Sequence, residues 1–470
     1  PVKKKTGEIV YGTGVCLDSE EKRLEDLAFL KGKHPEAKQL DAFLERVHYL
    51  GFNSDEAAEY HLLVEKIAEL RKAKDIPDHL IFYLATPPQK YGPIAEALRK
   101  SKLNKASEEG GWRRIIVEKP FGYDLESARE LNKTYASVFN EHQIYRIDHF
   151  LGKETAQNVL AFRFSNGIFE PLWNRNYIDY VEITAVENLG IEQRGGFYET
   201  AGALRDMVQN HLIQLVALTA MEPPTVFKAD NFRNEVVKVY ESLTPLNEVD
   251  LNEHIVRGQY TASGNKKGYR EEKGVAPDSR TDTYIAMKLG ISNWRWSGVP
   301  FYIRTGKQMP TKVTEIVVHF RETPHQMFHC AGGNCPRANK LILRLQPNEG
   351  IVLKIGMKVP GAGFEVRQVT MDFSYAQLGG VPSGDAYARL IDDCIQGDPT
   401  LFTRSDAVEA SWKFFDPVLR YWKDNPDAPR YGYPAGTWGP LESEAMMREH
   451  GAEWTNPCKN LTNTDEYCEL

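Results

Sequence analysis

The chain has 470 residues, of which 41% are hydrophobic and 26% are charged, as in an ordinary globular protein of two or three domains. Its formal net charge is −7 and it contains no long block of Lys or Arg, which argues against nucleic acid as a main partner. Six cysteines are too few for a disulfide scaffold, and no run of about 18 apolar residues is present to span a membrane, so the composition favours the reducing cytoplasm.

The first 150 residues alternate between short β-rich runs and segments with helical spacing of apolar residues. Strands are predicted at 8–13, 46–52, 80–86, 114–120 and 143–150. Helices are predicted between them, at 20–30, 55–74, 93–103 and 124–139. This alternation is typical of βαβ units with a parallel sheet, in which ligands bind beyond the carboxyl ends of the strands.

From about residue 175 the pattern changes to apolar and polar residues that alternate with period two, as in an antiparallel sheet with one covered face. Strands are predicted at 177–187, 235–243, 254–262, 282–292, 300–306, 315–322, 340–347, 350–360 and 367–375. One long helix is predicted at 201–221, and two more at 385–396 and 405–422. The second part of the chain is therefore predicted to be an α+β domain with a large, mostly antiparallel sheet.

The stretch "RIDHFLGKE", residues 146–154, gathers acids and potential cations around one glycine. If the segment after Asp148 is helical, His149 and Lys153 are four positions apart and share a face. A phosphate between the two cations, at a helix N-terminus, would relieve their repulsion. The alternative is a solvated helix start decorated with ion pairs, and spacing alone leaves both interpretations open.

Two further residues have both a chemical and a structural interpretation. Lys119 precedes a proline at the end of a predicted strand, so it stays extended and projects either into a crevice or from an ordinary turn. His211 lies on the apolar side of the predicted 201–221 helix, as a packed core residue or as a general base near neutral pH. Asp148 would be the acid partner of such a base.

One cluster in the sequence contains potential metal ligands. Cys330 and Cys335 lie near His329, but their spacing matches no standard zinc pattern. We therefore predict no metal site.

Several motifs together point to one family. "RIDHFLGKE" closely resembles the signature of the glucose-6-phosphate dehydrogenases, and it stands among other stretches that resemble this family in the family's order, from about residue 40 to 439. These are "FYLATPPQKY", "IIVEKPFG", "RDMVQNHLIQ", "EVVKVY", "VRGQYT", "NWRWSGVPFYIRTGK", "RLQPNEG", "DAYARLI" and "GTWGP". The resemblance implies a Rossmann-like dinucleotide-binding domain over residues 1–150 and a substrate-binding and dimerisation domain over residues 151–470.

The resemblance also implies an activity. The enzyme would oxidise D-glucose 6-phosphate to 6-phospho-D-glucono-1,5-lactone with hydride transfer to NADP or NAD, the first step of the pentose phosphate pathway. It would act as a homodimer or homotetramer.

The resemblance further assigns roles to individual residues. His211 would be the general base that takes the proton of the anomeric hydroxyl, oriented by Asp148. The residues implied to bind the substrate or its phosphate are His149, Lys153, Glu187, Asp206, Lys307, Lys312, Gln346 and Lys119. Those implied to bind the nicotinamide cofactor are Lys119, Tyr91 and Pro88. No metal is implied.

The sequence departs from the family pattern in three places. The glycine-rich fingerprint of the first strand–turn–helix is not found, and "IVYGTGV", residues 9–15, resembles the second strand of the family instead. We therefore expect the first strand and helix to lie upstream. Val15 or Cys16 stands where an arginine for the 2′-phosphate is usual, which leaves NADP against NAD open. Phe150 replaces a tyrosine that is common in the signature.

These departures keep two alternatives open. One is a non-catalytic homologue that binds sugar phosphates, although such a protein has no need of the base. The other is a related oxidoreductase with a different sugar substrate, against which the His149–Lys153 phosphate pair argues.

Overall fold

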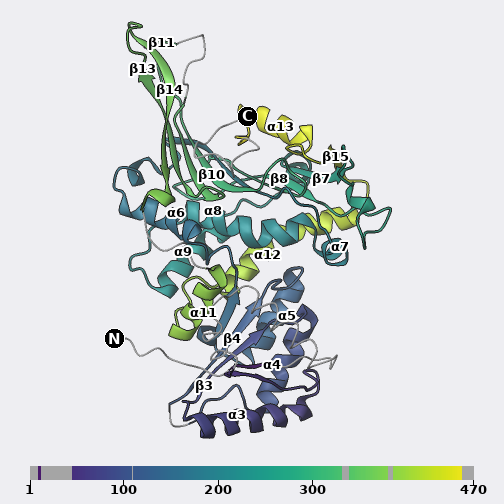
Figure 1. Ribbon diagram of the computed structural model, residues 1–470. Helices are drawn as coiled ribbons and strands as arrows, with labels where there is room; N and C mark the ends of the chain where they lie inside the picture. Colours follow the sequence, from purple (N-terminus) through teal and green to yellow (C-terminus); the bar gives the residue numbers. More distant parts are fainter. Residues whose placement is uncertain are drawn as a thin grey trace. The chain divides into compact units, whose positions relative to one another are not determined.

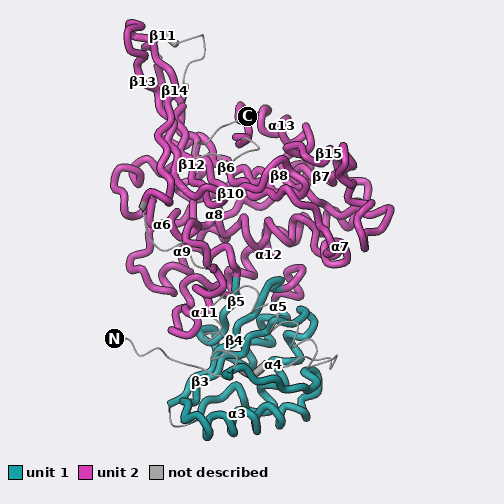
Figure 2. Tube along the Cα trace, in the orientation of Figure 1, with its two compact units in different colours: residues 1–121, 129–147 teal, residues 122–128, 148–470 magenta. Residues whose placement is uncertain are grey.

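The computed structural model describes residues 9–11, 45–107, 110–325, 327–330, 338–378 and 385–457. The chain divides into two compact units, shown in teal and magenta in Figure 2. Unit 1 comprises residues 1–121 and 129–147, and unit 2 comprises residues 122–128 and 148–470. The predicted domain boundary after residue 150 lies close to Ile147, the last residue of unit 1.

Unit 1 contains a three-stranded parallel sheet in the order β3-β4-β5. Its strands are β3 (His79–Leu84), β4 (Trp112–Glu118) and β5 (Ile144–Ile147). The helices between and before them are α3 (Tyr60–Lys74), α4 (Tyr91–Lys100) and α5 (Leu125–Ala136), of which residues 125–128 fall in unit 2. A separate parallel pair joins β1 (Ile9–Tyr11) to β2 (Val47–Tyr49). The predicted Rossmann-like parallel sheet is confirmed, whereas the helix predicted at 20–30 lies outside the described residues.

The centre of unit 1 shows why its sequence forms parallel strands. β4 places Ile115, Ile116 and Val117 in the interior in succession, and such continuous apolar runs are expected where helices cover both faces of a sheet. Because the three strands run parallel, their carboxyl ends meet at one edge.

Unit 2 is built on a ten-stranded sheet in the order β11-β14-β13-β12-β10-β6-β9-β8-β7-β15. Most neighbouring strands pair antiparallel, and the parallel pairs are β11–β14, β6–β9 and β7–β15. The strands are β6 (Ile178–Val186), β7 (Ile255–Thr261), β8 (Tyr284–Leu289), β9 (Phe301–Gly306), β10 (Val313–Phe320), β11 (His329–Cys330), β12 (Lys340–Gln346), β13 (Gly350–Lys358), β14 (Glu365–Ser374) and β15 (Tyr431–Pro434). The predicted large, mostly antiparallel sheet is confirmed.

Helices cover one face of this sheet, where α6, α8 and α12 run beneath the central strands (Figure 1). The helices of unit 2 are α6 (Glu154–Ser165), α7 (Gly195–Ala203), α8 (Ile213–Ala220), α9 (Ala229–Glu241), α10 (Glu248–Glu253), α11 (Ala386–Gln396), α12 (Ser405–Asp424) and α13 (Leu441–Arg448). Every residue of α8 is buried, so this helix lies in the core of the unit. None of the described helices is long and apolar enough to cross a bilayer.

The strand predicted at 235–243 is wrong, because this segment belongs to helix α9. The β-branched run "VVKV" favours a strand locally. The helix extends upstream, however, and buries Phe232, Val236 and Tyr240, which are four positions apart. This helical spacing against α8 and α12 overrides the local preference.

The single long helix predicted at 201–221 is in fact three consecutive segments. Helix α7 ends at Ala203, a π-helix spans Leu204–Leu212, and α8 follows from Ile213. The junction between α7 and the π-helix contains Gly202, with φ 63° and ψ 173°, a conformation that is essentially restricted to glycine.

Candidate active site

The segment that joins β5 to α6 carries the first site residues. Asp148 directly follows β5, and its Oδ1 accepts a hydrogen bond of 2.9 Å from the backbone N–H of Phe150. A short polar side chain that binds the backbone two residues on favours a turn over a helix. The expectation that His149 and Lys153 share a helix face is therefore wrong, since α6 begins only at Glu154, with Lys153 as its N-cap residue.

The glycine of the "FLGKE" stretch is required by close packing. A Cβ atom on Gly152 would lie 2.7 Å from the carbonyl oxygen of Ala386 and 2.8 Å from Leu390 Cδ1. The turn can therefore press against helix α11 only without a side chain at this position. This contact fixes the place of Lys153, the next residue.

His211 and Asp148 are in direct contact, although 63 positions separate them. His211 Nδ1 lies 2.8 Å from Asp148 Oδ1, and their side chains are only 1% and 3% exposed. An acceptor-only carboxylate at this distance requires the N–H on Nδ1, which makes Nε2 the nitrogen that carries the lone pair. This is the arrangement of a histidine base oriented by an acid.

Aromatic rings surround the imidazole of His211. The ring of Phe150 stacks on it, with centroids 4.2 Å apart, and the ring of His149 meets it edge-on at 4.8 Å. His149 is partly exposed and stacks in turn on Tyr387. One carboxylate oxygen of Asp148 and one ring nitrogen each of His149 and His211 all lie within 4.8 Å of one another. The two neighbouring rings thus restrict the orientation of the His211 imidazole.

Lys153 projects from the start of α6 toward strand β12. Its Nζ donates a hydrogen bond of 2.9 Å to Gln346 Oε1 and lies 4.1 Å from the centre of the Phe150 ring. Gln346 Nε2 donates in turn to Thr314 Oγ1 at 2.7 Å. Thr155 Oγ1, on α6, donates to the carbonyl oxygen of Leu345 at 3.0 Å, so the helix is tied to the strand that carries Gln346.

The charge environment of Lys153 is crowded. Burial and the neighbouring charge of Lys312 lower the pKa of Lys153, while Asp148, Glu349 and Glu187 act in the opposite direction. A lysine that shares its surroundings with a second lysine is a suitable host for a phosphate, because an anion relieves their repulsion.

Sheet register brings further predicted residues to one end of the central strands. In the parallel β6–β9 pair Val186 is opposite Gly306, so Glu187 and Lys307 leave the two strands side by side and form an ion pair. In the antiparallel β10–β6 pair Val313 is opposite Val186, which places Lys312 at the same end. Gln346 lies at the same end because it is opposite Thr314 in the antiparallel β10–β12 pair.

Asp206 lies on the same π-helix as His211. The hydrogen bonds of a π-helix span five residues instead of four, and Asp206 is five positions before His211. The two side chains therefore come closer to a common face than they would on an α-helix. Asp206 is 9% exposed, and its charge, like that of Glu187, acts on the buried Tyr198.

The predicted cofactor residues all belong to unit 1. Lys119 directly follows β4, and Pro88 begins a short 3₁₀ turn after β3. Tyr91 opens α4, where it is 1% exposed and packs in the core of the unit. Val15, Cys16 and Cys335 lie outside the described residues, as do the side chains of His329 and Cys330.

The structure adds residues that the sequence did not single out. The hydroxyl of Tyr240 is buried without a hydrogen-bond partner among the described residues, and burial, followed by the charge of Asp148, raises its pKa well above the ordinary value. Glu349 lies near Lys153, and burial raises its pKa. The sequence gives no signal for Tyr240, because the local pattern at 235–243 predicts a strand and not the helix that buries this side chain.

Comparisons with known proteins agree with this geometry. Residues 18–158 match the family described as "Glucose-6-phosphate dehydrogenase, NAD binding domain", and residues 160–455 match "Glucose-6-phosphate dehydrogenase, C-terminal domain". The chain is 50% identical over 432 residues to a glucose-6-phosphate 1-dehydrogenase of Aggregatibacter actinomycetemcomitans, covering 91% of this chain and 86% of the relative. It is 46% identical over 437 residues to that of Treponema pallidum (strain Nichols), covering 92% and 84%.

Solved structures give the same result. A glucose-6-phosphate dehydrogenase in complex with its substrate glucose-6-phosphate superposes with a TM-score of 0.85 at 35% identity, covering 96% of this chain and 91% of the other. The glucose-6-phosphate 1-dehydrogenase of Mycobacterium avium superposes with a TM-score of 0.81 at 36% identity, with the same coverage. The chain therefore belongs to the glucose-6-phosphate dehydrogenase family.

Proposed function

We infer that this protein is an NADP-dependent dehydrogenase that oxidises the C1 hydroxyl of D-glucose 6-phosphate to 6-phospho-D-glucono-1,5-lactone, the first step of the pentose phosphate pathway. The observation that carries this function is the buried Asp148–His211 pair, in the same unit as the Lys153–Gln346 contact. One arrangement supplies a base for a hydroxyl proton, and the other a cation for a phosphate.

We propose that His211 Nε2 accepts the proton of the C1 hydroxyl. As C1 is oxidised its oxygen has to lose a proton, and a histidine has a suitable pKa for this task near neutrality. Asp148 holds Nδ1 at 2.8 Å, so the ring keeps its tautomer and the imidazolium that forms is stabilised. The ring of Phe150 prevents the imidazole from tilting.

The phosphate of the substrate is assigned to Lys153, His149, Lys312 and Gln346. Charge-assisted hydrogen bonds from these groups anchor the substrate far from the reacting carbon, and this remote binding aligns C1 with the base. Glu187, Asp206 and Lys307 are assigned to the sugar hydroxyls, for which two carboxylates and an ammonium offer both acceptors and donors.

Unit 1 fits the cofactor. The carboxyl ends of three parallel strands meet at one edge of its sheet, which is where dinucleotides bind in such folds. The residues of unit 1 that would hold NADP are Lys119, Pro88 and Tyr91, and Lys119 is also assigned to the substrate. When bound, NADP supplies the acceptor for the hydride of C1.

A non-catalytic sugar-phosphate-binding protein would need the cationic residues but no oriented base. The 2.8 Å contact between His211 and Asp148, with both side chains buried, argues against this alternative. The neighbouring charges of Lys153 and Lys312 disfavour a neutral sugar as the substrate, because such a sugar has no anion to relieve their repulsion.

Absorbance at the reduced-nicotinamide band tests the function directly. Purified protein with glucose 6-phosphate is expected to generate this band with NADP. Parallel samples with NAD measure the cofactor preference, and samples with glucose measure the need for the phosphate. Binding of glucose 6-phosphate without any reduced nicotinamide would support the non-catalytic alternative instead.

We also propose that the protein works in the cytoplasm as a homodimer or homotetramer. The small number of cysteines supports the location, because disulfides are rare in a reducing cytoplasm. The exposed apolar side chains of strands β13 and β14 and of the connection between them, Met357, Phe364, Met371 and Phe373, support assembly through this part of the sheet, because patches of this kind mark protein–protein interfaces.

A further inference from the structure

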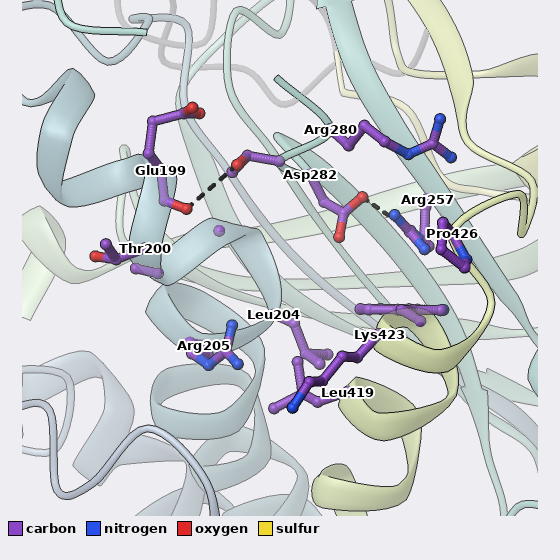
Figure 3. A pocket seen from close by; sticks show the side chains of 14 residues that line it. Glu199, Thr200, Leu204, Arg205, Arg257, Arg280, Asp282, Leu419, Lys423 and Pro426 are labelled. Carbon is purple, nitrogen blue, oxygen red and sulfur yellow. Dashed lines mark hydrogen bonds and ion pairs between the residues drawn. The ribbon is translucent and has the colours of Figure 1, made fainter. Parts of the chain in front are cut away.

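A hollow lies in unit 2, outside the residues assigned to the substrate. It is a cavity of about 280 Å³ lined by the end of α7, the start of the π-helix, strand β7, the loop before β8 and the end of α12. Four of its lining side chains are cationic and two are acidic (Figure 3): Arg205, Arg257, Arg280, Lys423, Glu199 and Asp282. We call this cavity the arginine pocket.

The two acids of the arginine pocket are already engaged. Asp282 Oδ1 accepts a 2.9 Å hydrogen bond from Arg257 Nε. Glu199 Oε1 accepts hydrogen bonds of 2.6 Å from both the Tyr269 and the Ser279 hydroxyl groups. Asp282 also acts on Arg205 and Arg280, and Asp124 and Asp416 act on Arg205, so the charges of the three remaining cations are offset only in part.

The remaining cations have few partners. Arg205 donates from Nε to the carbonyl oxygen of Tyr123 at 2.8 Å, and Arg280 makes one long contact of 3.5 Å with the carbonyl oxygen of Ala428. Among the described residues Lys423 has no hydrogen-bond or ion-pair partner. The cationic side chains are spread around the hollow rather than gathered at one wall (Figure 3).

One further arginine, Arg430, adds positive charge next to the pocket. Burial and the neighbouring charges of Arg280 and Arg270 lower the pKa of Arg430 to about 10. Only repulsion or burial moves an arginine in this direction. With four cations and two acids in its lining, the pocket keeps an excess of positive charge and is suited to a ligand that carries more than one negative charge.

We propose that the arginine pocket binds a small phosphorylated anion with two linked phosphoryl groups. Guanidinium groups match phosphate oxygens with paired, charge-assisted hydrogen bonds. The cavity of about 280 Å³ lies just below the usual range of roughly 300–1,000 Å³ for ligand pockets, which suits a compact diphosphate rather than a whole dinucleotide.

The pocket adjoins the segment that carries His211, so a bound ligand can affect that segment. Residues 199–202, 204 and 205 line one side of the pocket, and the chain continues from Arg205 into Asp206 and, five residues later, His211. A ligand that joins Arg205 to Lys423 on α12 holds the start of the π-helix in place. The bound anion therefore restrains the segment that carries the base.

Titration with inorganic pyrophosphate tests the proposal. The protein is saturated with glucose 6-phosphate in the absence of cofactor, so that the substrate's own phosphate site is filled, and pyrophosphate is added in a calorimeter. The double variant Arg280→Gln/Lys423→Gln removes two exposed cations that have no assigned part in catalysis. Lys267→Gln, which removes an exposed lysine outside the pocket, is the matched control.

We expect the wild type and the control to bind pyrophosphate equally well, and the double variant to bind it at least about tenfold more weakly. Inorganic phosphate in a parallel titration is expected to bind more weakly than pyrophosphate. Undiminished binding by the double variant, or no binding by the wild type, would overturn the site, and equal affinity for both anions would overturn the diphosphate assignment.

Amide hydrogen exchange tests whether a ligand in the arginine pocket restrains the segment that carries His211. Pyrophosphate is expected to slow exchange across residues 199–212 in the wild type and in the control, but not in the double variant. Unchanged exchange in the wild type at saturating pyrophosphate contradicts the coupling. Because turnover of glucose 6-phosphate is measured separately, failure of this site is distinguishable from failure of the proposed activity.

Discussion

The buried carboxylate of Asp148 has to be stabilised by its hydrogen-bond partners. A carboxylate that is 3% exposed is costly unless it is hydrogen-bonded, and here it accepts from both His211 and the N–H of Phe150. The acid is thus held by groups that keep it charged. A charged acid beside Nδ1 favours proton uptake at Nε2, which is the step that we propose for His211.

Lys153 is predicted to recognise the phosphate rather than the sugar. We expect Lys153→Ala to weaken the binding of glucose 6-phosphate by roughly 10–100-fold, the range for a lost charged hydrogen bond, and to leave any activity on glucose unchanged. Steady-state kinetics with both sugars measure this difference. Lys358→Ala, which removes an exposed lysine on β13, is the control, and equal losses for both sugars would disprove the phosphate role.

The pKa of Lys153 predicts how substrate binding depends on pH. Burial and Lys312 lower this pKa from 10.5, and only the protonated ammonium attracts the phosphate. Affinity for glucose 6-phosphate is therefore lost as pH rises, starting at a lower pH than for an ordinary lysine. In Lys153→Arg, whose guanidinium stays protonated, the loss begins at a higher pH.

Calorimetric titration of glucose 6-phosphate across alkaline pH, without cofactor, compares the two proteins. The wild-type affinity should fall first. If affinity depends on pH in the same way for the wild type and Lys153→Arg, deprotonation of Lys153 does not cause the loss of substrate binding.

At the scale of elements, the π-helix Leu204–Leu212 accounts for what sequence periodicity could and could not predict. Its apolar residues correctly placed His211 on a buried face of a helix. Periodicity gave no sign that the hydrogen-bonding pattern changes at Leu204, because that change depends on Gly202 and on the backbone hydrogen bond of 2.8 Å from Ala203 to Asp282. The strand predicted at 235–243 failed for a similar reason, since packing against α8 and α12 outweighed local preference.

Gly202 is predicted to be required for the entry into the π-helix. With φ 63° and ψ 173°, an alanine there is strained by about 1–3 kcal/mol, so Gly202→Ala should lower the denaturant midpoint and reduce kcat together. Gly196→Ala is the control, because its added Cβ meets nothing within 4 Å and its φ is not positive. A Gly202→Ala protein as stable and active as the control would contradict this role.

At the scale of the whole molecule, both sheets could be predicted because each follows from a simple pattern in the sequence. Alternating strands and helices indicated the parallel sheet, and period-two runs indicated the large antiparallel sheet. The active-site cluster could not be assembled in the same way. His211 and Asp148 are 63 positions apart, and their contact depends on where the π-helix packs, which no local pattern encodes; the family resemblance supplied that pairing.

Assembly of the molecule is predicted to depend on the exposed side of β14. Met371, 58% exposed, is expected to be buried between subunits, so Met371→Glu should shift the protein toward monomers because a charge is costly in an apolar interface. Sedimentation velocity measures the change. Ile168→Glu, at a residue 73% exposed outside the sheet, should leave the assembly unchanged, and a Met371→Glu protein that sediments like the wild type would exclude this interface.

Turnover of His211→Asn, with substrate binding measured in parallel, is the most direct test of the base. Asparagine retains a polar side chain of similar reach but does not take up a proton, so kcat for glucose 6-phosphate with NADP should fall by about 10²–10⁴-fold, while the dissociation constant of glucose 6-phosphate stays unchanged. Near-normal turnover in this variant would show that another group removes the hydroxyl proton.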